Sequence, residues 1–419
     1  MRFPRYALRG ASIAAAIASA PVLGEDGVQI YGTLNVDVES VEASGATEAS
    51  TLPPGFLGAT PTGVNVARRT RVTSNSSNLG FRGTETISPG LAAFFQVESA
   101  VNVDGGGSNI ASRNTAVGMS GPWGSWRLGQ WDTPYKTISG AVDPMYFTGI
   151  AYTGAIIGTP GFGVGPTTIG IPATSGDGKT FAAGPNASFE RRQGNSIQYW
   201  SPAFSGLAAR VAYSVDEAKT ARVDPRIVSA SLEYDAGTFY LAYAHEDHRD
   251  YFGLDALVPA AQATPVNAAG SSRDRGDKLI ARVKLGGTQV GVIAETLRYE
   301  KDRGDAAAGA FSRYKRNALA LTLLQKVGAA GTLRAIVAKA SNGSCARFDG
   351  SSCDTSDLGA RQVSLGYSYT LSKRTDLYAF YTRVSNDARA SYQFANGAGL
   401  GAAPGSTSTG YLLGMRHTF

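Results

Sequence analysis

The sequence predicts an all-β protein, a transmembrane β-barrel of sixteen antiparallel strands, and three observations support this fold class. First, the segment 28–39 alternates apolar and polar residues without interruption, which is the pattern of a strand with different solvents on its two faces. Second, about ten alternating residues is the length that a tilted strand needs to cross a bilayer. Third, similar segments recur to the end of the chain, whereas no apolar run is long enough for a membrane-spanning helix.

Composition suits an exported all-β chain but does not decide its architecture. Glycine accounts for 52 of the 419 residues, whereas the chain has only 2 Cys, 4 Met and 3 His. A secreted β-sandwich or a β-solenoid is compatible with the same proportions. Sandwich strands more often have five or six residues, and no short repeat typical of a solenoid occurs. Strand length therefore favours the barrel.

The N-terminal segment predicts export. Arg2, Arg5 and Arg9 precede the weakly apolar stretch 11–20, and a small-residue cleavage site follows, best placed after Gly24. We therefore expect a signal peptide at 1–24 and a single barrel domain at 25–419. Because the signal peptide holds three arginines and no acid, its removal lowers the formal net charge from +6 to +3. The apparent basicity then gives little support for a nucleic-acid partner.

The other strand candidates occur as pairs joined by short turns, with long polar or Gly-rich segments between the pairs. The pairs are 70–85 with 91–101, 113–120 with 125–131, 195–201 with 207–215, 226–234 with 238–247, 278–285 with 288–299, 313–326 with 332–340, and 361–370 with 375–385, and a last strand is expected at 409–419. This alternation of short and long connections is typical of an up-and-down membrane barrel with short turns in the periplasm. An even count also lets the last strand pair with the first, which leaves no open edge in lipid.

Four segments carry a resemblance to a known family. They are 77–85 (SNLGFRGTE), 113–121 (RNTAVGMSG), 369–378 (YTLSKRTDLY) and 414–419 (GMRHTF). In them the chain resembles the general porins of Gram-negative bacteria, in particular the trimeric sixteen-stranded porins of the neisserial and beta-proteobacterial kind. The resemblance implies an outer-membrane channel for passive diffusion of small hydrophilic solutes and ions. It also implies a homotrimer in outer-membrane lipid. We expect no cofactor, no metal site and no nucleic-acid partner.

The longest connection, 132–192, is expected to narrow the channel. In the family the third loop folds inward, and a connection of this length is usually functional or disordered. The alternative is an external loop that covers the trimer surface. The family's inward loop often carries Pro-Glu-Phe-Gly, where this chain has Gly161 in place of the glutamate. Asp132, Asp143 and Asp177 are the candidate substitutes for that carboxylate.

Charged side chains on the polar faces of the strands are the candidate lumen residues. The resemblance implies a ladder of wall cations that faces acids on the inward loop, and alternation places charges inward because one facing lipid costs about 2–4 kcal/mol at the midplane. The candidates are Arg82, Glu98, Arg113, Arg191, Arg192, Arg210, Arg282, Lys284 and Arg334, with Asn78 at a position where the family often has arginine. The alternative for any single arginine is a position near the solvent-exposed rim of the barrel instead of inside the channel. With few loop acids, we expect a mild preference for anions.

The C-terminal residue, the two cysteines and two of the histidines carry further expectations. In the family a C-terminal phenylalanine such as Phe419 is recognised by the barrel assembly machinery. Cys345 and Cys353 lie eight positions apart in one expected external loop, so a disulfide is plausible after export. His245 and His248 fall on opposite faces of a strand and are assigned to a wet strand end rather than a metal site.

Three other functions are the alternatives to a channel for passive diffusion. A solute-specific channel of the same fold would bind its ligand at the long loop. A non-conducting structural or adhesive barrel would lack ion conductance. An enzyme in a barrel is improbable, because no nucleophile motif with a histidine partner occurs.

Overall fold

The computed structural model describes most of the mature chain. The described residues are 27–52, 55–161, 188–215, 219, 224–258, 270–304, 306–395 and 399–419. The expected signal peptide at 1–24 and the candidate Asp177 lie outside them.

Nineteen strands form one sheet in the described part of the chain. They are β1 Gly27–Ser44, β2 Val66–Ser74, β3 Asn78–Ser88, β4 Leu91–Val101, β5 Ser108–Asn109, β6 Thr115–Gly121, β7 Gly124–Asp132, β8 Arg192–Trp200, β9 Leu207–Val215, β10 Arg226–Asp235, β11 Phe239–Arg249, β12 Ser272–Leu285, β13 Thr288–Lys301, β14 Phe311–Val327, β15 Gly331–Ala340, β16 Ser344–Arg347, β17 Ala360–Thr370, β18 Thr375–Asn386 and β19 Thr407–Thr418. β5 and β16 are short additions beside β4 and β14, and β2 and β3 follow one another along β1. Counting β2 with β3 and leaving out the two additions gives sixteen barrel strands, as expected.

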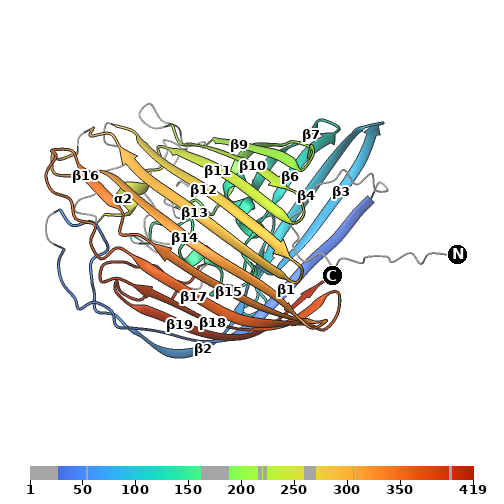
Figure 1. Ribbon diagram of the computed structural model, residues 1–419. Helices are drawn as coiled ribbons and strands as arrows, with labels where there is room; N and C mark the ends of the chain where they lie inside the picture. The colour runs from blue at the N-terminus through green and yellow to red at the C-terminus, as the bar shows by residue number, and fades with distance from the viewer. Residues whose placement is uncertain are drawn as a thin grey trace.

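The sheet closes on itself through its first and last strands. β19 pairs antiparallel with β1 from Thr33 opposite Thr418 to Ser44 opposite Thr407, and its other edge pairs with β18. Figure 1 shows the tilted strands around the closed barrel, with the C-terminus beside β1. Closure removes the edges that could not be satisfied in lipid. The prediction of a closed antiparallel barrel is confirmed.

One expected strand is interrupted. The sequence predicts a single strand over 70–85, but β2 ends at Ser74 and β3 begins at Asn78. Between them Ser76 has a positive φ of 53°, which displaces the backbone from the ladder. The Ser77 hydroxyl replaces the missing ladder bonds, because it accepts from Asn35 N at 2.9 Å and donates to Asn35 O at 3.0 Å. The Ser77 side chain thus bonds to β1 where backbone ladder bonds are missing, and β2 and β3 together occupy one strand position in the barrel.

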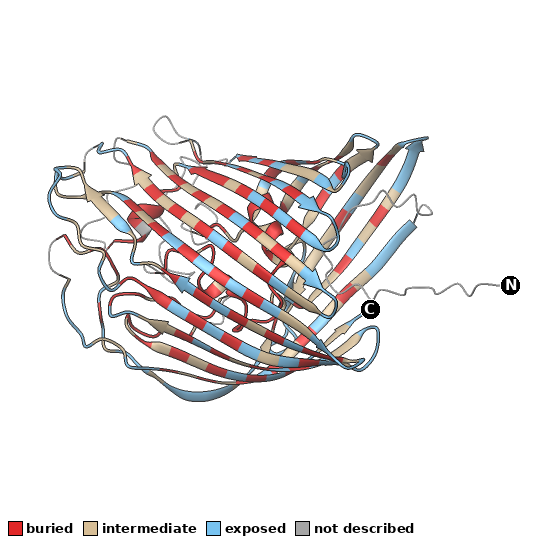
Figure 2. Cartoon of the chain, viewed as in Figure 1, coloured by how far each residue is buried: buried red, intermediate tan, exposed pale blue. Residues whose placement is uncertain are grey.

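The two faces of the barrel differ in polarity, as the alternation predicts. On β14, Leu319, Leu321 and Leu323 are exposed on the outer face, whereas Ala320 and Thr322 between them are buried. Figure 2 shows the same alternation of buried and exposed residues along neighbouring strands. An apolar outer band on a β-barrel is the surface that acyl chains cover.

Helical structure is limited to four short pieces in the described residues. They are α1 Pro134–Thr137, η1 Ile138–Ala141, η2 Thr153–Ala155 and α2 Gly253–Ala256. Thr133 caps α1 by accepting from Lys136 N at 3.4 Å, and Pro134 at the first position suits its fixed φ. None of these helices has the length and apolarity needed to cross a membrane.

Candidate functional site

The segment 134–161, which follows β7, lies against the inner face of the barrel. Three wall side chains donate hydrogen bonds to its backbone carbonyl groups: Asn35 Nδ2 to Phe147 O at 2.6 Å, Thr322 Oγ1 to Val142 O at 2.8 Å, and Gln362 Nε2 to Tyr152 O at 2.9 Å. The donors lie on β1, β14 and β17. These strands belong to one continuous part of the sheet, in the order β14-β15-β17-β18-β19-β1, so the segment follows that part of the inner wall.

Three wall arginines hold the same segment. Arg282 Nη1 donates to Ala141 O at 2.9 Å, Arg316 Nη2 donates to Ile156 O at 2.9 Å, and Arg334 Nη1 donates to Pro144 O. All three arginines are buried. Their partners in the segment are neutral carbonyl groups, so these contacts position the backbone without cancelling the cationic charge.

Glu295 on β13 is the centre of a buried network under the segment. Its carboxylate accepts from Tyr135 Oη at 2.7 Å, from Gly158 N at 2.9 and 3.0 Å, and from Arg316 Nη2 at 3.0 Å. The side chains of Glu295 and Arg316 have no exposed surface. A buried ion pair is tolerated when further hydrogen bonds satisfy it, and the two loop donors supply them here.

A second buried cation joins the segment to the residues just before β8. Lys278 on β12 forms an ion pair with Glu190, which lies just before β8, and donates to Ser139 Oγ at 2.9 Å. Ser139 Oγ also donates to Glu190 at 2.6 Å. Burial raises the pKa of the Glu190 carboxyl, while Lys278 opposes that shift.

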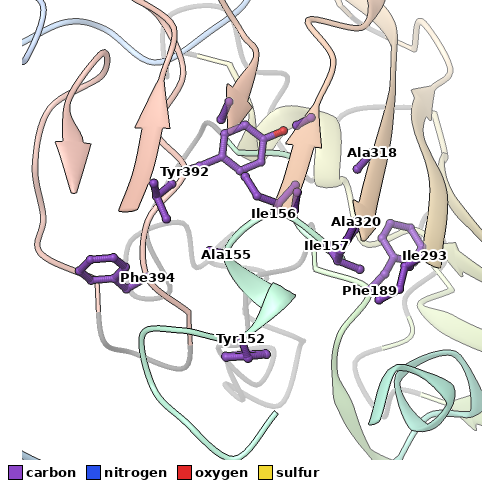
Figure 3. Packing of buried hydrophobic residues seen from close by; sticks show 14 of the residues in the cluster. Tyr152, Ala155, Ile156, Ile157, Phe189, Ile293, Ala318, Ala320, Tyr392 and Phe394 are labelled. Carbon is purple, nitrogen blue, oxygen red and sulfur yellow. The ribbon is translucent and has the colours of Figure 1, made fainter. Parts of the chain in front are cut away.

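Apolar packing supports these polar contacts. Ile156 and Ile157 of the segment join one buried cluster with Ile293, Ala318 and Ala320 of the wall, and Figure 3 shows these side chains together. The small alanine side chains let the segment approach β14 closely. The inner face therefore carries a packing surface for this segment as well as charges.

The predicted residues at the entry to the segment form one ion-pair group. Asp132 Oδ1 lies 2.9 Å from Lys136 Nζ and 3.1 Å from Arg192 Nη2. Arg192 Nε also donates to Asn114 Oδ1 at 2.7 Å. The charge of Asp132 is thus matched by two cations.

A second group of predicted residues lies on the wall formed by β1, β3 and β4. Glu98 pairs with Arg113 at 2.6 Å and accepts from Tyr31 Oη at 3.0 Å. The Arg82 guanidinium lies 5.0 Å from the centre of the Tyr31 ring and donates to Gln29 Oε1 at 2.9 Å. Arg82 therefore has neutral partners, whereas Arg113 has an acidic one.

The remaining wall candidates are scattered. Arg210 pairs with Glu233 at 3.1 Å and stacks over Trp200, and Arg191 lies 5.3 Å from the centre of the Tyr251 ring. Lys284 is exposed near the end of β12. The Asn78 amide bonds to Ser76 O at 3.1 Å, within its own turn.

Two candidates in the long connection have local partners. Asp143 is buried and accepts from Met145 N, Thr153 N and Thr153 Oγ1 at 2.7–2.8 Å. Burial raises the pKa of the Asp143 carboxyl, and these hydrogen bonds oppose the shift. Gly161 has a φ of +75° and lies so close to the Tyr392 ring that a Cβ would overlap it.

One assignment was wrong. His248 was expected at a wet strand end, but it is fully buried, bonds to Glu246 at 2.8 Å and stacks on Phe189 at 4.4 Å between ring centres. His245, as expected, lies on the opposite face and pairs with Asp277. Phe189, which is 59 positions away in the sequence, packs on His248 and buries this end of β11.

The buried network around Glu295 and Lys278 was not predicted from the sequence. The predicted site residues did not include the wall residues Lys278, Glu295 and Arg316 or their loop partners Tyr135 and Glu190. The alternation of inward and outward side chains could have identified Lys278 and Arg316. Lys278 shares a strand face with Arg282, and Arg316 shares one with Ala318. In the described residues no group of acids, histidines or cysteines could hold a metal ion.

Comparison with known proteins agrees with this architecture. A family model described as Gram-negative porin matches residues 11–389. The chain is 27% identical to outer membrane porin protein 32 of Delftia acidovorans over 97% of this chain and 98% of that protein. It is 24% identical to the major outer membrane protein P.IB of Neisseria lactamica, with the same coverage of both chains. Among solved structures it is similar to the anion-selective porin from Comamonas acidovorans, with a TM-score of 0.68, 22% identity, and coverage of 94% of this chain and 100% of that one.

Proposed function

Because this chain belongs to the Gram-negative porin family, we propose that its segment 134–161 forms the narrowest part of the channel and that the channel prefers small anions. The protein is an outer-membrane β-barrel through which small hydrophilic solutes and ions diffuse passively. Members of the family are channels and not enzymes. Pore radius and wall charge then decide which solutes pass.

The observation that carries the proposal is the kind of partner that the wall arginines have. Arg282, Arg316 and Arg334 bind carbonyl oxygens of the segment. A carbonyl dipole orients a guanidinium but leaves its unit charge in place. Of these three, Arg316 has a close carboxylate partner at 3.0 Å and Arg282 has one at 3.4 Å. Among the residues that the structure describes, no acid lies within ion-pair distance of Arg334. Of the three arginine charges beside the segment, that of Arg334 is therefore left unmatched.

The segment itself adds almost no negative charge. Between 134 and 161 the only acid is Asp143, and its carboxylate is buried and turned toward Met145 and Thr153. Charges in a low-dielectric wall raise the local concentration of counter-ions. The named anion selectivity of the Comamonas porin agrees with this proposal.

The proposal is tested by reconstitution into planar bilayers. With a tenfold gradient of KCl, we expect stepwise conductance and a reversal potential with the sign for chloride preference. A reversal potential for potassium preference would reject the anion proposal but leave the channel function intact. Saturable block by a single solute would instead favour the solute-specific channel.

The assembly of the protein follows from the same family membership. We propose a homotrimer, recognition of Phe419 by the barrel assembly machinery, and removal of residues 1–24 on export. Cross-linking of detergent-extracted protein would give a trimer band, and N-terminal sequencing of the mature chain would begin at Glu25.

A further inference from the structure

Three outward-facing cations lie side by side at one rim of the barrel. Lys339 on β15, Arg361 on β17 and Arg383 on β18 are all exposed. Lys339 and Arg361 are direct cross-strand partners. Arg383 is opposite Val363, two positions from Arg361 on the same face. Cross-strand neighbours on one face lie about 5 Å apart and diagonal ones about 7–8 Å, so the three form one group, the rim triad.

The rim triad has no acidic partner within ion-pair distance in the described part of the chain. Arg383 Nε donates a hydrogen bond to Ser385 Oγ at 3.1 Å, which is a neutral partner. The carboxylate of Asp387 lies over Gly359 and, in the described residues, forms no ion pair with Arg361. Like charges directly opposite on a sheet are destabilising. The triad is therefore a place where an added anion would relieve repulsion.

Three other outward cations on the barrel are matched by acids. Arg68 pairs with Glu42, Arg273 with Asp247, and Arg275 with Glu300. The sequence thus supplies acids for these cations but not for the triad.

The triad also lies directly next to the apolar outer band. Val337 and Val363 are two residues from Lys339 and Arg361 on the same faces, and they are 54% and 46% exposed. Tyr381, two residues from Arg383, packs against Tyr411 at 5.0 Å between ring centres. Tyrosines mark the interface between acyl chains and headgroups. All three cations adjoin the long connection between β15 and β17 or the one after β18, so they lie at the end away from the short periplasmic turns.

We propose that the rim triad binds a phosphate group on the headgroup of a lipid in the outer leaflet. Arginine presents donors that match phosphate oxygens in a bidentate way, and lysine adds a point charge. The acyl chains of the same lipid would cover the adjoining valines. The proposal rests on the outer-membrane location of the barrel and is independent of its ion preference.

Native mass spectrometry of the folded protein in detergent tests the proposal, with bis-phosphorylated lipid A as the probe. We expect Lys339→Gln/Arg361→Gln/Arg383→Gln to weaken lipid A binding at least tenfold. The matched control Arg68→Gln/Arg273→Gln/Arg275→Gln removes the same charge from paired positions of the outer face, and its affinity should stay within about twofold of the unmodified protein. Heat-modifiable electrophoretic mobility and unchanged single-channel conductance establish that both variants are folded.

Two further arms distinguish the source of the phosphate and the role of total charge. Dephosphorylated lipid A should bind equally weakly to all three proteins, and inorganic phosphate should compete only weakly, because it lacks acyl chains. Equal loss in both triple variants would show a general charge effect and overturn the proposal. Full competition by inorganic phosphate would overturn the lipid assignment.

Discussion

The ring of Phe419 lies over the Cα of Gly32, at the point where the last strand meets the first. Gly32 N donates to Phe419 O at 3.2 Å, and Phe419 N donates to Gly32 O at 3.1 Å. A Cβ at position 32 would lie 2.5 Å from the ring and 2.7 Å from Asn78 O. Barrel closure at this end therefore requires a residue without a side chain.

Gly32→Val is expected to impair closure. The added side chain would meet both a ring and a backbone oxygen, so the ring must move or the strand pair must open. We expect a lower temperature for the heat-modifiable shift in electrophoretic mobility. Gly105→Val is the matched control, because nothing lies near a Cβ at that position. An unchanged transition temperature in Gly32→Val would contradict the packing.

Arg282→Gln/Arg334→Gln is expected to reduce the anion preference. Both side chains keep a hydrogen-bond donor for the loop carbonyls but lose their charge, so the counter-ion concentration near the segment falls. We expect the permeability ratio of chloride to potassium to fall by roughly twofold or more, as estimated from loss of two wall charges.

Its control removes two charges from the outer face. Lys339→Gln/Arg361→Gln should leave the reversal potential unchanged, since these side chains face lipid and headgroups. If both pairs shift the reversal potential equally, the selectivity does not reside at Arg282 and Arg334.

Arg316→Met is expected to destabilise the inward segment. The variant removes the closer of the two cations beside the buried Glu295 and leaves Lys278 Nζ at 3.9 Å, so the cost is at most that of a broken buried pair, about 3–5 kcal/mol. We expect noisier open-channel current and faster proteolysis within 134–161. The double variant Arg316→Met/Glu295→Leu should recover part of the lost stability, because no unpaired charge remains. Lys315→Gln, on the outer face of the same strand, is the control and should behave like the unmodified protein.

Reduction of the external disulfide is expected to loosen a loop and leave the barrel intact. Cys345 and Cys353 are joined with their Cα atoms 5.8 Å apart, and the loop also bonds to the 55–57 segment through Leu57 N and Asp354 O at 3.0 Å. A disulfide of this kind contributes about 2–3 kcal/mol. We expect reductant to speed proteolysis at 348–354 and leave the barrel's thermal transition within a few degrees. A Cys345→Ser/Cys353→Ser variant should match the reduced protein and be insensitive to reductant.

Alternation along single strands was enough to predict most of the barrel. It placed Arg282 and Arg334 inside, because consecutive side chains of a strand point to opposite faces. It failed between β2 and β3, where the Ser77 hydroxyl replaces backbone bonds and periodicity is almost undisturbed. It also did not anticipate that His248 would be covered by Phe189.

The partners of the candidate lumen residues were beyond the reach of the sequence. Arg334 meets the carbonyl of Pro144, 190 positions away, and Arg316 meets that of Ile156. A backbone carbonyl is the same group in every residue, so no residue type marks it as a partner. Similarly, Asp143 looked like a loop acid that faces the channel, whereas the local fold turns it toward Thr153.

By itself the sequence determined the closed two-faced sheet, because strand period, strand length and an even strand count are local properties that only one membrane architecture satisfies. Only the tertiary structure decided which wall charges are matched and which are not. Closure brings together residues such as Glu190 and Lys278, and the distances between them depend on barrel diameter and register, which no single segment of the chain specifies.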